Sequence, residues 1–145
     1  SFFKPIAERE GLTLALEMPD NLPELYVDPD RLRQILNNLV SNAIKYTPPG
    51  GKVTVRAKTQ DDHVVLEVQD TGIGLSDQDR EHLFERFFRS SRPEVQHEQG
   101  SGIGLALVKG VVEAHGGRIE AEGQPGKGST FRVILPIHPS AEEST

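Results

Sequence analysis

The chain has 145 residues, no cysteine and a formal net charge of −6, and 35% of its residues are hydrophobic. This length and apolar content predict one compact domain with its own core. The acidic balance argues against nucleic acid as a partner, because phosphate contacts come mainly from clustered Lys and Arg, and the absence of cysteine excludes disulfides and thiolate metal sites and favours a reducing, cytoplasmic setting.

The N-terminal part begins with Ser1 rather than Met, so we expect a piece of a longer protein. We expect residues 1–10 to form the last turns of a helix or a linker, which ends at Gly11. The next apolar residues alternate with polar ones, which is the period of a half-buried strand; they are Leu12, Leu14, Leu16 and Met18. Residues 19–23 predict a turn and residues 25–27 a short extended piece. No run approaches the roughly 20 apolar residues of a membrane span, and there is no signal-peptide pattern.

Residues 28–46 predict a helix with one buried stripe. Asp28 can cap it and Pro29 fits its first turn. The apolar residues recur at i, i+3, i+4 and i+7 spacing; they are Leu32, Ile35, Leu36, Leu39, Val40 and Ala43. Asn38, Asn42 and Lys45 form a second stripe roughly 100° around the helix, at the edge of the core. Since asparagine is a mediocre helix former, the two amides are either simple surface residues or part of a polar site.

Two alternating strands follow a break at residues 47–51, and a turn at residues 61–62 joins them. The alternation places Asp70 on the same face as Val64, Leu66 and Val68. A carboxylate there is costly unless it accepts hydrogen bonds. It could cap the turn at residues 71–74, or it could form the floor of a pocket, because the glycines of DTGIG allow close backbone approach.

Ser76 can cap a further helical stretch, which ends in an apolar cluster with interleaved arginines; these residues are Leu83, Phe84, Arg86, Phe87, Phe88 and Arg89. Residues 90–99 are polar and aperiodic, so they predict a mobile loop that needs a ligand to become ordered. GSGIG then starts a broadly apolar helix over residues 105–115, which we expect to be well buried and to end at Gly116.

Two more alternating strands, residues 119–121 and 131–135, flank a hairpin loop at residues 123–129. The tail, residues 138–145, is polar and expected to be loose. Because every strand alternates, the sheet should have one covered and one wet face, with helices from three places on the covered face. The predicted fold class is α/β (α+β): a two-layer sandwich in which about three helices cover a mixed, mostly antiparallel sheet of about five strands.

Gly100, Gly102 and Gly104 precede a helix, and free amides at a helix N-terminus attract anions. The dinucleotide fingerprint does not fit, because a polar loop rather than a strand precedes these glycines, and the sequence has no GxxxxGK[ST] run. The remaining phosphate interpretation is a site between this helix start and the asparagine-bearing helix. Mg²⁺ would fit there, since one or two amide oxygens plus phosphate oxygens and waters satisfy it.

Five ordered motifs resemble the N, G1, F, G2 and G3 boxes of the catalytic ATP-binding domain of sensor histidine kinases, which has the Bergerat fold. They are NNLVSNAIKYTPPGG, DTGIG, LFERFFR, GSGIGLALVKGVVEAHGG and GKGSTF. The similarity covers about residues 1–136. It implies a linker or helix end from a missing dimerisation domain at residues 1–10, the catalytic domain at residues 11–137, and a flexible tail at residues 138–145.

The resemblance also implies a role for particular residues. Asn42 matches the Mg²⁺ ligand, and Asn38 supports the same metal and phosphate site. Lys45 matches a phosphate contact and Tyr46 a residue that packs against the base. Asp70 matches the acceptor for the adenine amino group. The other implied nucleotide-binding residues are Gly72, Gly74, Gly100, Gly102, Gly104, Leu105 and Thr130, with Thr130 and Gly128 closing the adenine end.

Arg89 resembles an arginine expected near the terminal phosphate, and residues 90–101 correspond to the ATP lid. The helical hairpin that carries the phosphate-accepting histidine in the family is missing. The chain's own histidines are expected to be surface or turn residues; they are His63, His82, His97, His115 and His138. The resemblance thus implies that this domain, as a monomer, binds Mg-ATP and donates the γ-phosphoryl group to a histidine on a separate domain, from which it passes to a response regulator. The parent is expected to be a homodimer anchored in the cell membrane.

Two alternatives remain open. Related ATPases of the gyrase, mismatch-repair and heat-shock chaperone type resemble a pattern with glutamate at the place of Asn38, where it activates water. An amide cannot accept that proton, which disfavours hydrolysis. The domain could also be a non-enzymatic module that uses nucleotide only to fold or to dock.

Overall fold

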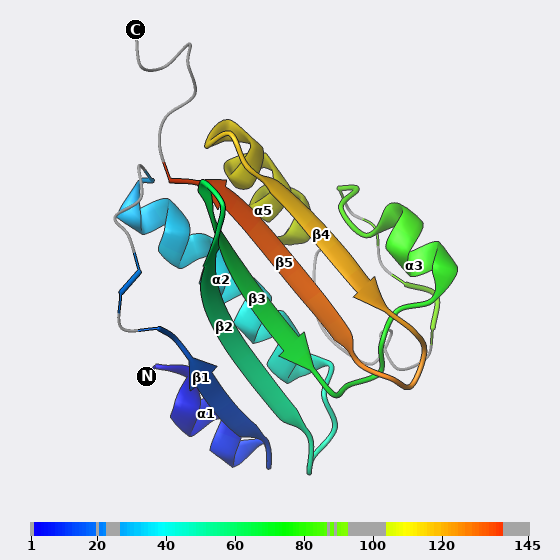
Figure 1. The fold of residues 1–145 in the computed structure, drawn as a ribbon. Coiled ribbons are helices and arrows are strands. Elements are labelled where there is room, and N and C mark those ends of the chain that lie inside the picture. Colours follow the sequence, from blue (N-terminus) through cyan, green and yellow to red (C-terminus); the bar gives the residue numbers. More distant parts are fainter. Residues whose placement is uncertain are drawn as a thin grey trace, which may run out of the picture.

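The structure, a computed structural model, describes residues 2–19, 21–22, 27–86, 88, 90–92 and 104–137. Its centre is a five-stranded sheet in the order β1-β2-β3-β5-β4 (Figure 1). β1 pairs with β2 in parallel, and the other neighbours are antiparallel. The strands are β1 (Thr13–Glu17), β2 (Lys52–Gln60), β3 (His63–Asp70), β4 (Arg118–Gly123) and β5 (Ser129–Pro136). The predicted mixed, mostly antiparallel sheet is therefore confirmed.

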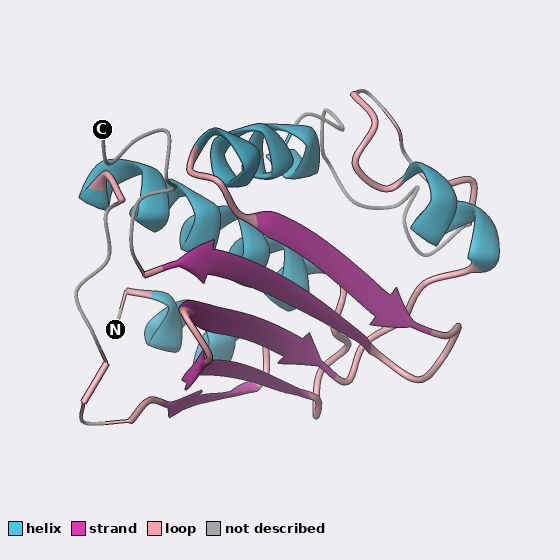
Figure 2. Cartoon of the chain, turned by 45° about the horizontal axis from the view of Figure 1, so that its top comes forward, coloured by secondary structure: helices cyan, strands magenta, loops and turns pink. Residues whose placement is uncertain are grey.

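Helices α2 and α5 lie together on one face of the sheet, and α3 lies beyond the β4 edge (Figure 2). The described helices are α1 (Phe3–Arg9), α2 (Pro29–Lys45), α3 (Asp77–His82) and α5 (Gly104–Ala114). The Asp28 side chain caps α2 by accepting from the Asp30 amide at 2.9 Å, as predicted. None of the helices in the described ranges is long and apolar enough to cross a membrane.

The core lies between the sheet and these helices. Ile35 and Leu39 of α2 and Val108 and Val112 of α5 are each at most 1% exposed. They pack on inward-facing strand residues, which are Val53, Val64, Val68, Val133 and Leu135. The opposite face carries ion pairs between strands, Glu17–Arg56, Arg132–Glu67 and Arg132–Glu122, so one face is covered and the other is wet.

Two burial predictions were wrong. Helix α5 buries only Val108 and Val112, and Leu107 is 40% exposed, because a single stripe of the helix packs inward on the sheet and α2 and no described part of the chain covers its outer side. Strand β1 buries little of its length, with Leu16 56% exposed, because it is an edge strand and the helical cover stops at Leu12 and Leu14. Residues 25–26 and 138–145 lie outside the described ranges.

A histidine fixes the register of α2 against α5. The Nδ1 atom of His115, just past the end of α5, contacts the Val111 carbonyl oxygen at 2.8 Å, and Nε2 accepts from the Asp28 amide at 3.4 Å. The end of α5 is thereby joined to the start of α2. Because the helices run in opposite directions, the start of α5 then lies beside the middle of α2, where Gly104 meets Asn38.

Candidate functional site

A pocket of about 290 Å³ opens between α2, the end of β3, α3 and the start of α5. This volume lies near the lower end of the range for small-molecule sites. The structure describes most of the site residues that the sequence predicts, and most of these line the pocket. They are Asn38, Asn42, Lys45, Tyr46, Asp70, Gly74, Gly104 and Leu105. Residues about 70 positions apart in the sequence thus line one pocket.

Asp70 ends β3 on the inner face of the sheet and is 6% exposed. Its Oδ1 accepts from the Gly72 amide at 2.9 Å and from the Ser129 amide at 3.3 Å, and its Oδ2 accepts from the Ser129 hydroxyl at 2.8 Å. Burial raises the pKa of Asp70, and these three bonds only partly oppose it. Both interpretations of the sequence are therefore compatible, since the carboxylate caps the turn and still presents an under-compensated acceptor to the pocket.

The turn after Asp70 tolerates only glycine at two positions. A Cβ on Gly72 would lie 2.3 Å from the Tyr46 carbonyl oxygen, and one on Gly74, at φ +73°, would lie 1.8 Å from that of Gln124. The Ile73 amide donates to the same Tyr46 carbonyl at 3.1 Å. The glycines thus let the turn pack against the end of α2, which places Tyr46 beside Asp70.

The two asparagines of α2 face the pocket from the opposite side. Asn38 Nδ2 donates to the Gln34 carbonyl at 2.9 Å, and its Oδ1 faces Gly104, where a Cβ would lie 2.9 Å from that oxygen. Asn42, one turn later, also lines the pocket, and its side chain makes no hydrogen bond to another described residue. The Asn38 amide oxygen is therefore oriented towards the start of α5, and the Asn42 side chain lies in the same pocket wall.

Lys45 and Tyr46 close the C-terminal end of α2. The Lys45 Nζ lies 5.5 Å from the centroid of the Tyr46 ring, within the range of a cation–π contact. Both residues line the pocket, as does Leu105 in the first turn of α5. The pocket therefore combines a flat aromatic surface, a positive charge and an apolar side chain.

The donor set fits a magnesium ion that is shared with a ligand. The described part of the chain contains no group of three or more His, Cys, Asp or Glu side chains that could hold a metal alone. Asn42 and Asn38 instead offer amide oxygens, and Mg²⁺ accepts one or two protein oxygens when phosphate and water supply the rest. The residues present thus suit a metal bound together with a polyphosphate.

Thr130 does not lie in this pocket. It pairs with Gln69 and, with that residue, lines a separate hollow on the outer face of the sheet. Its neighbour Ser129 faces inward and bonds Asp70 instead. The residue of this strand that lines the pocket beside Asp70 is therefore Ser129, one position before the expected Thr130. Strand alternation would have corrected this expectation, because Ser129 shares the parity of the buried Phe131 and Val133.

Asp79 is a pocket residue that the sequence analysis missed. It is 3% exposed and forms a capping box with Ser76 at the start of α3, with bonds of 3.0 and 3.1 Å. Burial raises the pKa of Asp79, but hydrogen bonds from Ser90, Ser76 and Arg92 outweigh it and hold the pKa below its ordinary value. Asp79 is therefore a charged anchor inside the pocket wall, and its pKa is shifted in the opposite direction to that of Asp70.

Several expected site residues lie outside the described ranges. They are Arg89, Gly100, Gly102 and residues 93–101 of the lid segment, whose roles stay predictions. Ser90 and Arg92, which the motif comparison assigns to the lid, are described and bond to the rest of the pocket wall.

A sheet covered on one face, with a pocket between an asparagine-bearing helix and a glycine-initiated helix, defines a nucleotide-binding domain. A model of the family of histidine kinase-, DNA gyrase B- and HSP90-like ATPases matches residues 27–139. The chain belongs to this family of ATP-binding domains.

Similar proteins include several sensor kinases. The adaptive-response sensory kinase SasA of Synechococcus elongatus is 44% identical over 126 residues, which are 86% of this chain and 32% of that kinase. The mycobacterial sensor histidine kinase MprB superposes with a TM-score of 0.81 at 33% identity, over 94% of this chain and 91% of that one. Full-length ShkA, solved with AMPPNP, gives a TM-score of 0.81 at 35% identity, over 97% of this chain and 28% of that one. The resemblance to the catalytic domain of sensor histidine kinases is confirmed, and the chain spans about a third of the length of SasA.

Proposed function

We propose that this domain binds Mg-ATP and donates its γ-phosphoryl group to a histidine on a separate domain of a sensor histidine kinase, from which the group passes to a response regulator. The observation that carries the proposal is one pocket lined by the amides of Asn38 and Asn42 and by the Asp70 carboxylate, with the Asn38 oxygen facing Gly104 at the start of α5. This arrangement has an acceptor at one end for a base and neutral oxygens at the other for a metal-bound polyphosphate.

Each described residue of the pocket has its own proposed role in binding Mg-ATP. Asp70 accepts the exocyclic amino group of adenine, and Tyr46 packs beside the base. Lys45 and the N-terminal amides of α5 attract phosphate oxygens, since a helix N-terminus carries partial positive charge. Asn42 and Asn38 would hold Mg²⁺, which when bound neutralises phosphate charge and orients the terminal group.

Transfer rather than hydrolysis follows from the amide at residue 38. A hydrolase needs a general base to take a proton from water, and an amide cannot do so. The acceptor is therefore a nucleophile brought by the partner domain. The parent is proposed to be a membrane-anchored homodimer, with this domain monomeric in isolation.

The test is to mix the domain with a candidate helical-hairpin partner and γ-labelled ATP. We expect label on a partner histidine, recognised because phosphohistidine is stable to alkali and labile in acid. Asn42→Ala should abolish the transfer while leaving the fold intact. Free phosphate released at an equal rate without any partner would instead establish hydrolysis, and ATP binding without either product would leave a binding module.

A further inference from the structure

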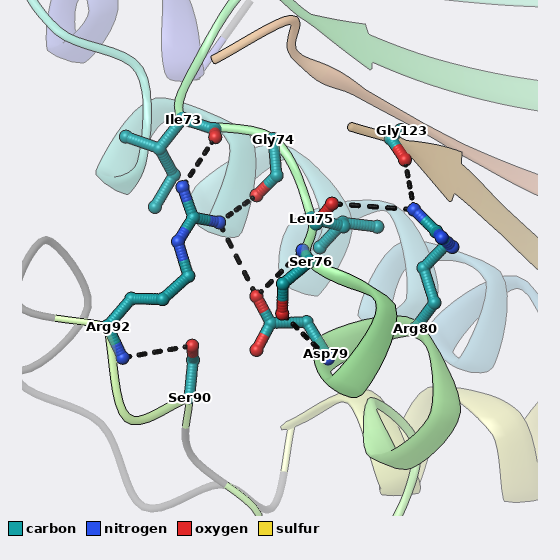
Figure 3. Close-up of polar contacts among 9 residues, drawn as sticks. All are labelled: Ile73, Gly74, Leu75, Ser76, Asp79, Arg80, Ser90, Arg92 and Gly123. Atoms are coloured by element: carbon teal, nitrogen blue, oxygen red, sulfur yellow. Dashed lines mark hydrogen bonds and ion pairs between the residues drawn. The ribbon is translucent and has the colours of Figure 1, made fainter. Parts of the chain in front are cut away.

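The guanidinium of Arg92 holds the glycine turn of the pocket from behind. Its Nη2 donates to the Ile73 carbonyl and its Nη1 to the Gly74 carbonyl, each at 2.8 Å, and Nη1 lies 3.4 Å from Asp79 Oδ2 (Figure 3). The side chains of Arg92 and Asp79 are 16% and 5% exposed. This is a sheltered, charge-assisted contact with three partners, of the kind that resists both salt and competition from water.

The same contact joins three separate segments. Ser90 Oγ donates to Asp79 and accepts from the Arg92 amide at 3.3 Å. Asp79 also accepts from the Ser76 amide at the start of α3. The turn after β3, the first turn of α3 and residues 90–92 therefore form one hydrogen-bonded unit, as Figure 3 shows.

This unit is one wall of the pocket. Ile73, Gly74, Asp79 and Ser90 all line the pocket, whereas Arg92 lies behind them. The Gly72 amide that orients Asp70 belongs to the same turn, one residue before the Ile73 carbonyl that Arg92 holds. A change in the path of this turn would therefore move the acceptor for the base.

We propose that Arg92 is a positioning residue for the adenine end of the site, acting through the Ile73 and Gly74 carbonyls and Asp79 and not through the phosphates. The planar guanidinium suits this role because it donates in several fixed directions at once, whereas lysine offers one compact charge on a flexible stem. The proposal rests on the nucleotide site proposed above and adds a residue that no motif of the chain assigns to the base.

Arg80 provides a matched control in the same region. It donates to the Leu75 and Gly123 carbonyls and pairs with Asp77, so it also ties a turn to α3 through backbone oxygens. Arg80 does not line the pocket and holds the side of α3 next to β4 (Figure 3). Arg80→Gln therefore removes a comparable clamp without touching the Ile73 and Gly74 carbonyls.

The experiment measures the affinities of adenosine, ADP and ATP by calorimetry for wild type, Arg92→Gln, Arg92→Lys and Arg80→Gln, together with thermal unfolding. We expect Arg92→Gln to weaken all three ligands by the same factor, about tenfold, since the loss lies on the part they share. Arg92→Lys should lose nearly as much, and it carries the test if Arg92→Gln does not fold. Arg80→Gln should lower the melting temperature and leave all three affinities unchanged.

Two results would overturn the proposal. If Arg92 variants bound ATP more weakly but adenosine normally, Arg92 would be a phosphate ligand. If Arg80→Gln weakened binding as much at an equal loss of melting temperature, the effect would be general stability. A wild-type domain that bound no ATP would refute the proposed function itself, which is a distinguishable outcome.

Discussion

Replacing Asp70 with asparagine tests the base end of the pocket most directly. The substitution keeps Oδ1, which accepts from the Gly72 and Ser129 amides, and replaces the second oxygen with an amide nitrogen. The Ser129 hydroxyl, now 2.8 Å from Oδ2, can turn and accept from that nitrogen, because a hydroxyl both donates and accepts. We therefore expect the fold to survive, while the pocket gains a donor where adenine also presents one.

The size of the effect follows from the lost bond. A hydrogen bond to a charged acceptor contributes roughly 1.5–3 kcal/mol, and an unpaired donor in a sheltered site adds to the loss. At about 1.4 kcal/mol for each factor of ten, ATP affinity should fall roughly 10- to 150-fold. GTP carries a carbonyl at the same ring position, so it should bind wild type weakly and bind Asp70→Asn more tightly. The preference for ATP over GTP should therefore be smaller in Asp70→Asn, or reversed.

Calorimetric titration of ATP and GTP into both proteins measures this. Asp62→Asn is the matched control, because it removes the same charge at an exposed position beside the opposite end of β3. Equal affinities of wild type for ATP and GTP would refute the base assignment. So would an Asp70→Asn protein that binds ATP as well as Asp62→Asn does.

Three further predictions concern the metal, the core and pH. Asn42→Ala should weaken Mg-ATP binding about tenfold and leave binding without Mg²⁺ unchanged, and a titration in which the metal makes no difference to wild type would contradict the metal assignment. Leu39→Ala should cost about 2–5 kcal/mol of unfolding free energy in denaturant, whereas Leu107→Ala, at 40% exposure, should cost less than about 1 kcal/mol. The pKa of Asp79 is lowered, so its stabilisation is present above its unfolded pKa and lost as pH falls through the folded value; the cost of Asp79→Asn should therefore vanish in acid. The pKa of Asp70 is raised, so its stabilisation is present below its unfolded pKa and is lost as pH rises through the folded value. The stability of Asp70→Asn relative to wild type should therefore improve with rising pH. If denaturation curves showed the same pH trend for Asp79→Asn and Asp70→Asn, the opposite pKa shifts of the two carboxyls would be contradicted.

Periodicity in the sequence was enough to place the elements and the faces they bury. The stripe of α2 and the alternation of β3 predicted that Ile35 and Leu39 lie in the core and that Asp70 points inward. Periodicity reports only which side of an element is apolar, however. Whether a covering layer exists depends on distant parts of the chain, which is why the exposure of Leu16 and Leu107 could not be predicted.

Pocket residues that belong to a sequence motif were predictable, and residues that support the pocket wall were less so. Asn42 and Asp70 are set by local spacing and by motifs. The contact of Arg92 with Ile73 and Gly74 spans 18 or 19 positions and ends on backbone oxygens, which leave no trace in residue identity. Only the folded arrangement of α3 and the turn brings these groups together.

The orientation of Asn38 ties the fold to the chemistry. Only the amide nitrogen can donate to the Gln34 carbonyl, so that bond forces Oδ1 towards Gly104. A carboxylate at the same position could not make it, because two acceptors would face each other and one would be left unsatisfied. The helix therefore favours an amide over an acid of the same length at this position. An oxygen held in this way can bind a metal or a donor but cannot take a proton from water, which is the property that the proposed phosphoryl transfer relies on.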